Sequence, residues 1–214
     1  QIRAERLPGS RYASPGQVEF EVRAARELME RNQIPSVDVT ECSVEEIASR
    51  ILERLDLEPK GYIAVTAHRK ENVDDPESLQ AILAGLALVH ERFGKVIVYP
   101  MHPRTQSKIK GLSVSKGIRV IDPLGFYDFN CLSMHAFCLM GDSGTTPEEG
   151  LFYRVPCVSL RKTTERPETV EAGAHIVAGM DPRNIADAVE TIVGMPWTAR
   201  YDFFEDFSPS SVVI

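Results

Sequence analysis

Cysteine is scarce in this 214-residue sequence, and its placement excludes the usual cysteine-based sites. None of the four cysteines forms a Cys-x-x-Cys pair, and three of them lie in or beside apolar runs. Such residues are typical of reduced core thiols, so we expect neither disulfides nor a zinc site, and no bound metal or cofactor. The four are Cys42, Cys131, Cys138 and Cys157.

Long hydrophobic runs and excess positive charge are also missing. No apolar run approaches the ~20 residues that a membrane span requires. The polar start of the chain, residues 1–6, does not resemble a signal peptide, and its lack of an initiator Met indicates processing or a longer parent chain. The formal net charge of −7 argues against a nucleic-acid partner, which would need a basic face. We therefore expect a cytoplasmic protein without a membrane or nucleic-acid partner.

Several signatures of catalytic folds are missing as well. The sequence has no Gly-x-Gly-x-x-Gly turn, no Walker lysine and no Gly-x-Ser-x-Gly elbow. It also lacks a second cluster of Asp and Glu at a strand end that could serve as an acid/base pair. The chain therefore has few groups for general acid/base chemistry.

What the sequence does contain is an alternation of short apolar runs with helical patterns. The runs are continuous, which is typical of a parallel sheet covered by helices on both faces, and they predict an α/β fold. Helices are predicted near residues 17–33, 44–57, 75–92, 105–110, 128–135, 147–153, 166–172 and 181–193, with 67–72 as a polar loop. Strands are predicted at 62–66, 95–100, 118–121, 136–140, 155–160 and 174–178.

The stretch 139–150 has the pattern of an anion site. An apolar strand ends in small, turn-forming residues, and Thr146, Pro147 and Glu149 then have the spacing of a capping box that opens a helix. Free backbone N–H groups and the positive end of the helix dipole would both face the turn. A phosphate group of a nucleotide is one interpretation; an ordinary capped turn without a ligand is the other.

Four polar loops follow predicted strands and should meet at one edge of the sheet, because parallel strands all end there. They span residues 66–72, 100–104, 141–145 and 161–168. As a group, their cations suit a highly charged anion such as a diphosphate; individually, each could be a solvated loop charge. These potential cations are His68, Arg69, Lys70, His102, Arg104, Arg161, Lys162 and Arg166.

Other polar residues in these loops have two possible roles each. His68 and His102 could be hydrogen-bonded structural histidines or donors to a phosphate oxygen. Asp142 is interpreted as a cap for its turn rather than a chemical group, whereas Glu149 could accept two ribose hydroxyls. His90, His135 and His175 are interpreted as structural.

In order and spacing, these loops resemble the non-hydrolysing UDP-N-acetylglucosamine 2-epimerase family over roughly residues 60–193. Residues 5–11 resemble the hinge of the same family more loosely. The matching motifs are Thr66-x-His68-Arg69-x-Glu71-Asn72, Tyr99-Pro100-x-His102-Pro103, Asp142-Ser143-Gly144 with Glu148-Glu149, and Arg161-x-Thr163-Thr164-Glu165-Arg166-Pro167-Glu168.

The resemblance implies roles for individual residues. His68 would be the catalytic-site residue beside the diphosphate, and Glu149 would bind the ribose. The second-site or phosphate-binding positions would be Arg69, His102 and Arg104; of these, Arg69 and His102 match positions that help to bind an activating UDP-sugar in some members. The remaining UDP-binding residues would be Ser143, Gly144, Thr145, Arg161 and Arg166.

The resemblance also implies an architecture of two Rossmann-like domains, of the GT-B type, of which this chain has the second. Residues 1–58 would be a hinge remnant and helical lead-in, 59–195 the UDP-binding domain, and 196–214 an aromatic, truncated interdomain segment. The family reaction eliminates UDP and adds it back with inversion at C2, using carboxylates of the first domain. The fragment alone should therefore bind UDP weakly and not epimerise.

Some alternatives remain open at this point. Thr145 stands where the family usually has a second glycine, which resembles a branch that acts on UDP-2-acetamido-2,6-dideoxyhexoses on the way to UDP-N-acetyl-fucosamine. A glycosyltransferase, a hydrolysing epimerase and a non-catalytic nucleotide-sugar-binding module are the other readings. The oligomeric state is open, with a homodimer as one option.

Overall fold

The computed structural model describes residues 14–32 and 50–197. By its internal contacts the chain divides into two compact units, residues 1–43 and 44–214. In the first unit, helix α2 (Pro15–Arg31) begins after Ser14, whose side chain accepts a hydrogen bond from the Gln17 amide, and no residue of the helix is buried. A helix is thus confirmed close to the predicted range. The predicted helix at 44–57 is described only from residue 50, and 50–54 are helical.

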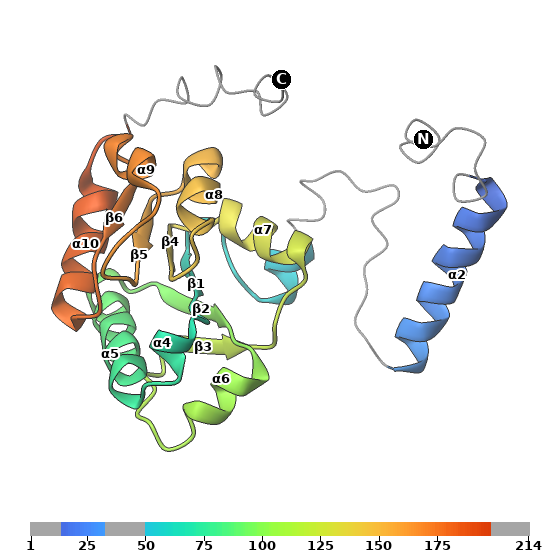
Figure 1. Cartoon of the computed structure of the whole chain (residues 1–214), viewed down its shortest axis with the longest axis horizontal. Helices are drawn as coiled ribbons and strands as arrows, with labels where there is room; N and C mark the ends of the chain where they lie inside the picture. The colour runs from blue at the N-terminus through green and yellow to red at the C-terminus, as the bar shows by residue number, and fades with distance from the viewer. Residues whose placement is uncertain (1–13, 33–49, 198–214) are drawn as a thin grey trace. The chain divides into compact units, whose positions relative to one another are not determined.

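The second unit contains a six-stranded parallel sheet with the order β3-β2-β1-β4-β5-β6 (Figure 1). This order is that of a doubly wound, Rossmann-like sheet, so the predicted fold class is confirmed. Every predicted strand is present, with ends shifted by up to two residues. The strands are β1 (Tyr62–Thr66), β2 (Val96–Pro100), β3 (Ile118–Ile121), β4 (Cys138–Gly141), β5 (Cys157–Ser159) and β6 (His175–Val177).

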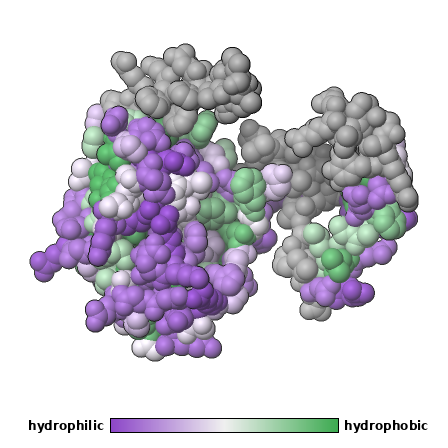
Figure 2. All heavy atoms as spheres, in the orientation of Figure 1, coloured by the Kyte–Doolittle hydropathy of each residue, from purple (hydrophilic) through white to green (hydrophobic). Residues whose placement is uncertain are grey.

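The long helices begin and end where their sequences supply caps. Asp75 and Asp181 accept amide hydrogen bonds at the starts of α5 and α10, each followed by a proline, and Gly94 ends α5 with φ +64°. The helices are α4 (Lys70–Val73), α5 (Pro76–Phe93), α6 (Pro103–Lys108), α7 (Phe126–Met134), α8 (Thr146–Tyr153), α9 (Pro167–Glu171) and α10 (Pro182–Gly194). Hydrophilic residues dominate the visible face over α4 and α6 (Figure 2).

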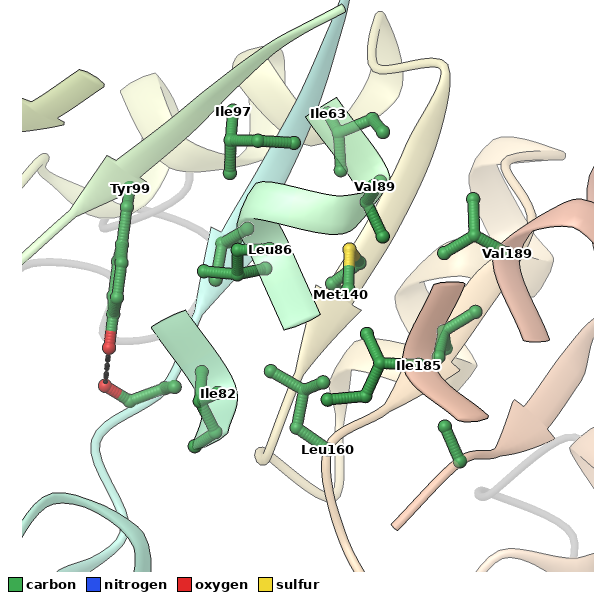
Figure 3. Packing of buried hydrophobic residues seen from close by; sticks show 14 of the residues in the cluster. Ile63, Ile82, Leu86, Val89, Ile97, Tyr99, Met140, Leu160, Ile185 and Val189 are labelled. Atoms are coloured by element: carbon green, nitrogen blue, oxygen red, sulfur yellow. Dashed lines mark hydrogen bonds between the residues drawn. The ribbon is translucent and has the colours of Figure 1, made fainter. Parts of the chain in front are cut away.

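Two apolar layers cover the sheet because alternate strand residues point to opposite faces. Ile63 and Val65 belong to the larger core, which packs against α5 and α10 (Figure 3). Tyr62 and Ala64 belong to the smaller core, with side chains of α7 and of the segment that precedes β1. All four side chains are buried, which explains why the strand reads as one continuous apolar run.

One predicted loop is partly helical. Residues 70–73 form the single turn α4, although the sequence predicts a polar loop over 67–72. Four residues are too few to show a helical period, so the pattern could not reveal this turn. Within the described residues, no helix combines the length and apolar character needed to cross a membrane.

Candidate functional site

The strand order reverses direction between β1 and β4, and ligands of such sheets bind outside the carboxyl ends of the strands at this point. Here a buried carboxylate, that of Asp142 after β4, joins the two neighbouring loops. It accepts hydrogen bonds from the His68 and Arg69 amides, at 3.0 and 2.9 Å, and from the Asn72 side chain at 3.0 Å. The interpretation of Asp142 as a cap for its own turn is therefore wrong, because its partners lie in the loop after β1.

Asn72 extends this connection to a third loop. Its amide nitrogen also donates to the Leu160 carbonyl, 3.2 Å away, at the end of β5, and its side chain is buried. The loops after β1, β4 and β5 are thus joined by one hydrogen-bonded group, Asp142 with Asn72, which we call the Asp142 clamp. Asn72 was not a predicted site residue; its only signal in the sequence is its place in the loop motif that begins at Thr66.

Strand β2 contacts the loop after β1 through Tyr99, whose hydroxyl donates to the Ala67 carbonyl at 2.6 Å (Figure 3). His102 is exposed and caps α6, because its Nδ1 accepts from the Arg104 amide at 3.2 Å. The Arg104 guanidinium forms an ion pair with Asp74, at the end of α4. Both predicted residues lie at the carboxyl edge, but each already has a local partner.

The turn after β4 leads directly into α8. The helix begins one residue earlier than predicted: Thr145 is the N-cap, with φ −85° and ψ −24°, and Thr146 is the first, buried helical residue. The predicted capping box is wrong, because Thr146 is helical, and the actual N-cap, Thr145, makes no side-chain capping hydrogen bond to the backbone. Instead, its hydroxyl lies 3.1 Å from that of Ser143. The positive end of the α8 dipole still faces this turn.

Glu149 lies in the first turn of α8 and is partly buried. Burial raises the pKa of its carboxyl group, and a hydrogen bond with Thr145 opposes that rise. A partly desolvated carboxylate in this position can accept hydrogen bonds from two vicinal hydroxyl groups.

The loop after β5 places two arginines differently. Arg161 is only 13% exposed and pairs with Glu165 at 2.7 Å, while Glu165 also lies 3.5 Å from Arg69. Arg166 instead pairs with Glu148 of α8 at 2.9 Å. Arg161 and Arg69 therefore converge on Glu165, which lies against Gly144 of the turn, whereas Arg166 pairs with the first turn of α8.

The His68 side chain is 60% exposed at this edge. Its Nδ1 lies 3.4 Å from the Thr66 hydroxyl and 3.6 Å from the Asp142 carboxylate. The backbone of His68 is thus held by the clamp, while most of the ring faces solvent. Such a ring can donate a proton or a hydrogen bond to a bound anion.

The other histidines have structural partners, as predicted. His90 and His135 bond through Nδ1 to the carbonyls of Lys95 and Cys131, at 2.9 and 3.0 Å. His175 is buried between the hydroxyls of Thr169 and Ser159, at 3.0 and 2.6 Å. Burial, with a smaller contribution from the positive charge of Arg161, lowers the pKa of His175 to about 4, so the ring is neutral at pH 7.

The buried thiols agree with the prediction of core cysteines. Cys131, Cys138 and Cys157 are free and buried, and Cys42 lies outside the described residues. Among residues 14–32 and 50–197, no group of three or more His, Cys, Asp or Glu side chains is arranged to hold a metal ion.

Together, the sheet order and the polar loops at its switch point define a class: Rossmann-like, doubly wound α/β domains. A sequence model of the UDP-N-acetylglucosamine 2-epimerase family matches residues 34–205, which is more than half of the chain. The chain belongs to this family. A kinase/pyrophosphorylase family model matches residues 1–52, less than half of the chain.

Individual relatives agree with this assignment. The UDP-N-acetylglucosamine 2-epimerase of Methanocaldococcus jannaschii is 38% identical over 138 residues, which cover 62% of this chain and 38% of the relative. The UDP-2,3-diacetamido-2,3-dideoxy-D-glucuronate 2-epimerase of Pseudomonas aeruginosa is 34% identical over 134 residues, with 63% and 38% coverage. The chain therefore spans about two fifths of the length of these relatives.

Solved structures show the same similarity. The M. jannaschii UDP-GlcNAc 2-epimerase in complex with UDP-GlcNAc and UDP superposes with a TM-score of 0.65 at 34% identity, over 72% of this chain and 45% of that one. A spinosyn rhamnosyltransferase, at 14% identity and a TM-score of 0.52, shares the fold alone, over 66% of this chain and 39% of that one.

Proposed function

We propose that this chain supplies the UDP-binding half of a UDP-N-acetylglucosamine 2-epimerase, which converts UDP-GlcNAc to UDP-ManNAc by eliminating and re-adding UDP. The observation that supports this proposal most strongly is the Asp142 clamp, which holds three post-strand loops together at the switch point of the sheet. Membership of the family and the UDP-bound relative agree with it.

In this proposal, the turn after β4 holds the diphosphate. Ser143 contributes a hydroxyl and Gly144 backbone donors, beside Thr145 at the start of α8. Arg161 lies beside Gly144 and supplies positive charge. Arg166 would join it only by releasing Glu148, because the two now form an ion pair.

The remaining proposed roles follow from position. Glu149 binds the ribose from the first turn of α8, and His68 lies beside the diphosphate as the catalytic-site residue. The second-site or phosphate-binding residues are Arg69, His102 and Arg104.

We further propose that residues 59–195 are the UDP-binding domain, that 1–58 are hinge and lead-in, and that 196–214 are a segment leading to a first domain. That domain would contribute the proton-transfer carboxylates, so the 214-residue chain by itself should not epimerise. The protein would act in the cytoplasm, where its buried thiols stay reduced. The product would serve synthesis of cell-surface polysaccharide.

Calorimetric titration of the 214-residue chain with UDP tests the binding step. We expect weak, saturable binding of UDP, and about tenfold weaker binding by Ser143→Ala, whose far-UV circular dichroism should match that of the parent. Ser107→Ala, on α6, is the matched control and should bind like the parent. Equal binding by the parent and Ser143→Ala, or no binding by any form, would contradict the proposal.

A chimera tests the catalytic step. Residues 59–195 would replace the corresponding segment of the M. jannaschii epimerase, and epimerisation of UDP-GlcNAc would be followed by NMR. The proposal predicts turnover by the chimera, a loss of at least a hundredfold with His68→Ala, and none by the 214-residue chain alone. A chimera that folds and binds UDP but does not turn over would show that this segment is a binding module.

A further inference from the structure

The cluster of Glu165 with Arg69 and Arg161 places a carboxylate at the turn that the proposed function assigns to the diphosphate. We propose that Glu165 is an internal competitor for the anion: its carboxylate occupies the phosphate position and must leave when a nucleoside diphosphate binds. This inference rests on the proposed function, and it adds a residue that sets affinity for the charge of the ligand.

The geometry around Gly144 indicates that the Glu165 carboxylate lies where a phosphate group would bind. A Cβ atom added to Gly144 would lie 2.5 Å from the Glu165 Oε1 atom and 4.0 Å from an Arg161 guanidinium nitrogen. The carboxylate therefore lies directly against the backbone of the turn, at the residue where only glycine leaves room for it. A phosphate oxygen that approaches the Gly144 backbone would need the same space.

The charges around the carboxylate are those that a phosphate would use. One oxygen of Glu165 lies 2.7 Å from Arg161 and the other lies 3.5 Å from Arg69, so two guanidinium groups from different loops converge on it. Arginine forks bind carboxylates and phosphates with the same geometry. The Glu165 carboxylate thus makes the contacts that a phosphate group of the ligand would make with the two arginines.

The exposure of the cluster indicates that the carboxylate can be displaced. The side chains of Glu165 and Arg69 are 46% and 34% exposed, and ion pairs between exposed side chains contribute little to stability. A hydrogen bond from its own backbone amide, assisted by the hydrogen bond with Arg161, lowers the pKa of Glu165, so it is charged at neutral pH. A diphosphate carries more negative charge than one carboxylate and should displace Glu165 from the two arginines. Because this displacement costs free energy, Glu165 weakens the apparent affinity for the diphosphate.

Titration of the full 214-residue chain and its variants with UDP and with inorganic pyrophosphate tests this inference. We expect Glu165→Gln, which keeps the size of the side chain but removes its charge, to bind both ligands about fivefold more tightly at low salt. The gain should shrink at 0.5 M salt, where charges are screened. Glu171→Gln, which removes an equal charge from an exposed position on α9, is the matched control and should bind like the parent.

The possible outcomes separate this inference from the proposed function. Tighter binding of both ligands by Glu165→Gln alone supports both proposals. Tighter binding of pyrophosphate without any binding of UDP supports competition and rejects the proposed function. Unchanged or weaker binding by Glu165→Gln overturns the inference. The carboxylate would then have no effect on the affinity, or would hold the arginines in place for the ligand. Equal gains in Glu165→Gln and Glu171→Gln overturn it too, since net charge alone would explain them.

Discussion

The carboxylates of Asp142 and Glu165 lie at the same edge of the sheet but differ in burial and in the kind of partner they bind. Asp142 is fully buried and accepts hydrogen bonds from two backbone amides and from the buried side-chain amide of Asn72. Glu165 is 46% exposed and pairs with the side chains of two arginines from different loops. We infer two layers in the site: an inner layer of buried hydrogen bonds that joins the loops, and an outer layer of ion pairs around Glu165 that would exchange partners when a ligand binds.

The largest effect should follow from removing the buried carboxylate. Asp142→Ala leaves two backbone amides and the Asn72 amide without their acceptor, and we expect a loss of about 3–5 kcal/mol in the free energy of unfolding. Urea denaturation measures it. Asp142→Asn, which keeps one acceptor oxygen, should lose less, and Glu165→Gln should change stability by under ~1 kcal/mol. Equal losses at the two carboxylates would remove the distinction between the layers.

A buried histidine provides a pH test of the inner layer. The pKa of His175 is about 4 in the folded chain against 6.5 for an ordinary histidine, so the unfolded chain binds this proton more tightly. Its stabilising contribution is therefore complete above pH 6.5 and is lost as the pH falls towards 4, by up to about 3 kcal/mol.

Urea denaturation at pH 7, 5.5 and 4.5 should show a shallower decline for His175→Gln than for the parent chain. His102→Gln, at an exposed position, serves as the control and should follow the parent. Parallel curves for the parent and His175→Gln would mean that burial of this ring does not resist protonation.

Substitutions in the outer layer should change the affinity for the ligand but leave the free energy of unfolding almost unchanged. Arg161→Ala removes the guanidinium nearest to the turn, and we expect UDP to bind about tenfold more weakly, or about 1.4 kcal/mol. The free energy of unfolding should fall by less than about 1 kcal/mol. Lys162→Ala, the exposed neighbour, is the control for calorimetry. A large loss of stability in Arg161→Ala would move this residue into the inner layer.

The smallest effect is expected at the turn itself. Thr145 has ordinary helical dihedrals, so Thr145→Gly relieves no strain and should cost about 0.5–1 kcal/mol of stability through added backbone freedom. The affinity for UDP should change less than threefold. A gain of tenfold or more would show instead that the threonine side chain crowds the diphosphate.

The fold was predictable because its signals are local and repeated. The strands are continuous apolar runs bounded by loops, and Asp-Pro pairs mark the starts of α5 and α10. The meeting of the polar loops at one edge then follows from the parallel topology. The turn α4 was missed because four residues carry no period, and the start of α8 was misplaced because Thr145 and Thr146 are both plausible caps.

The contacts within the site were not predictable from local pattern. Asn72 reaches Asp142 across 70 residues of sequence and Leu160 across 88, so no local signal connects them. The sequence identifies the arginines at the carboxyl edge of the sheet as cations, but it does not identify their carboxylate partners. The pairs of Arg104 with Asp74 and Arg166 with Glu148 join residues from different loops and helices, which only the folded chain brings together.

Backbone amide shifts in a ¹⁵N NMR titration of the 214-residue chain with UDP test the central claim most directly. If the post-strand loops form one diphosphate site, the amides of His68, Ser143, Gly144 and Arg161 should shift together, with one dissociation constant. Amides at the opposite edge of the sheet, such as those of Gly61 and Lys95, should stay unchanged. Shifts confined to one loop, different constants for different loops, or changes centred on the opposite edge would contradict the account.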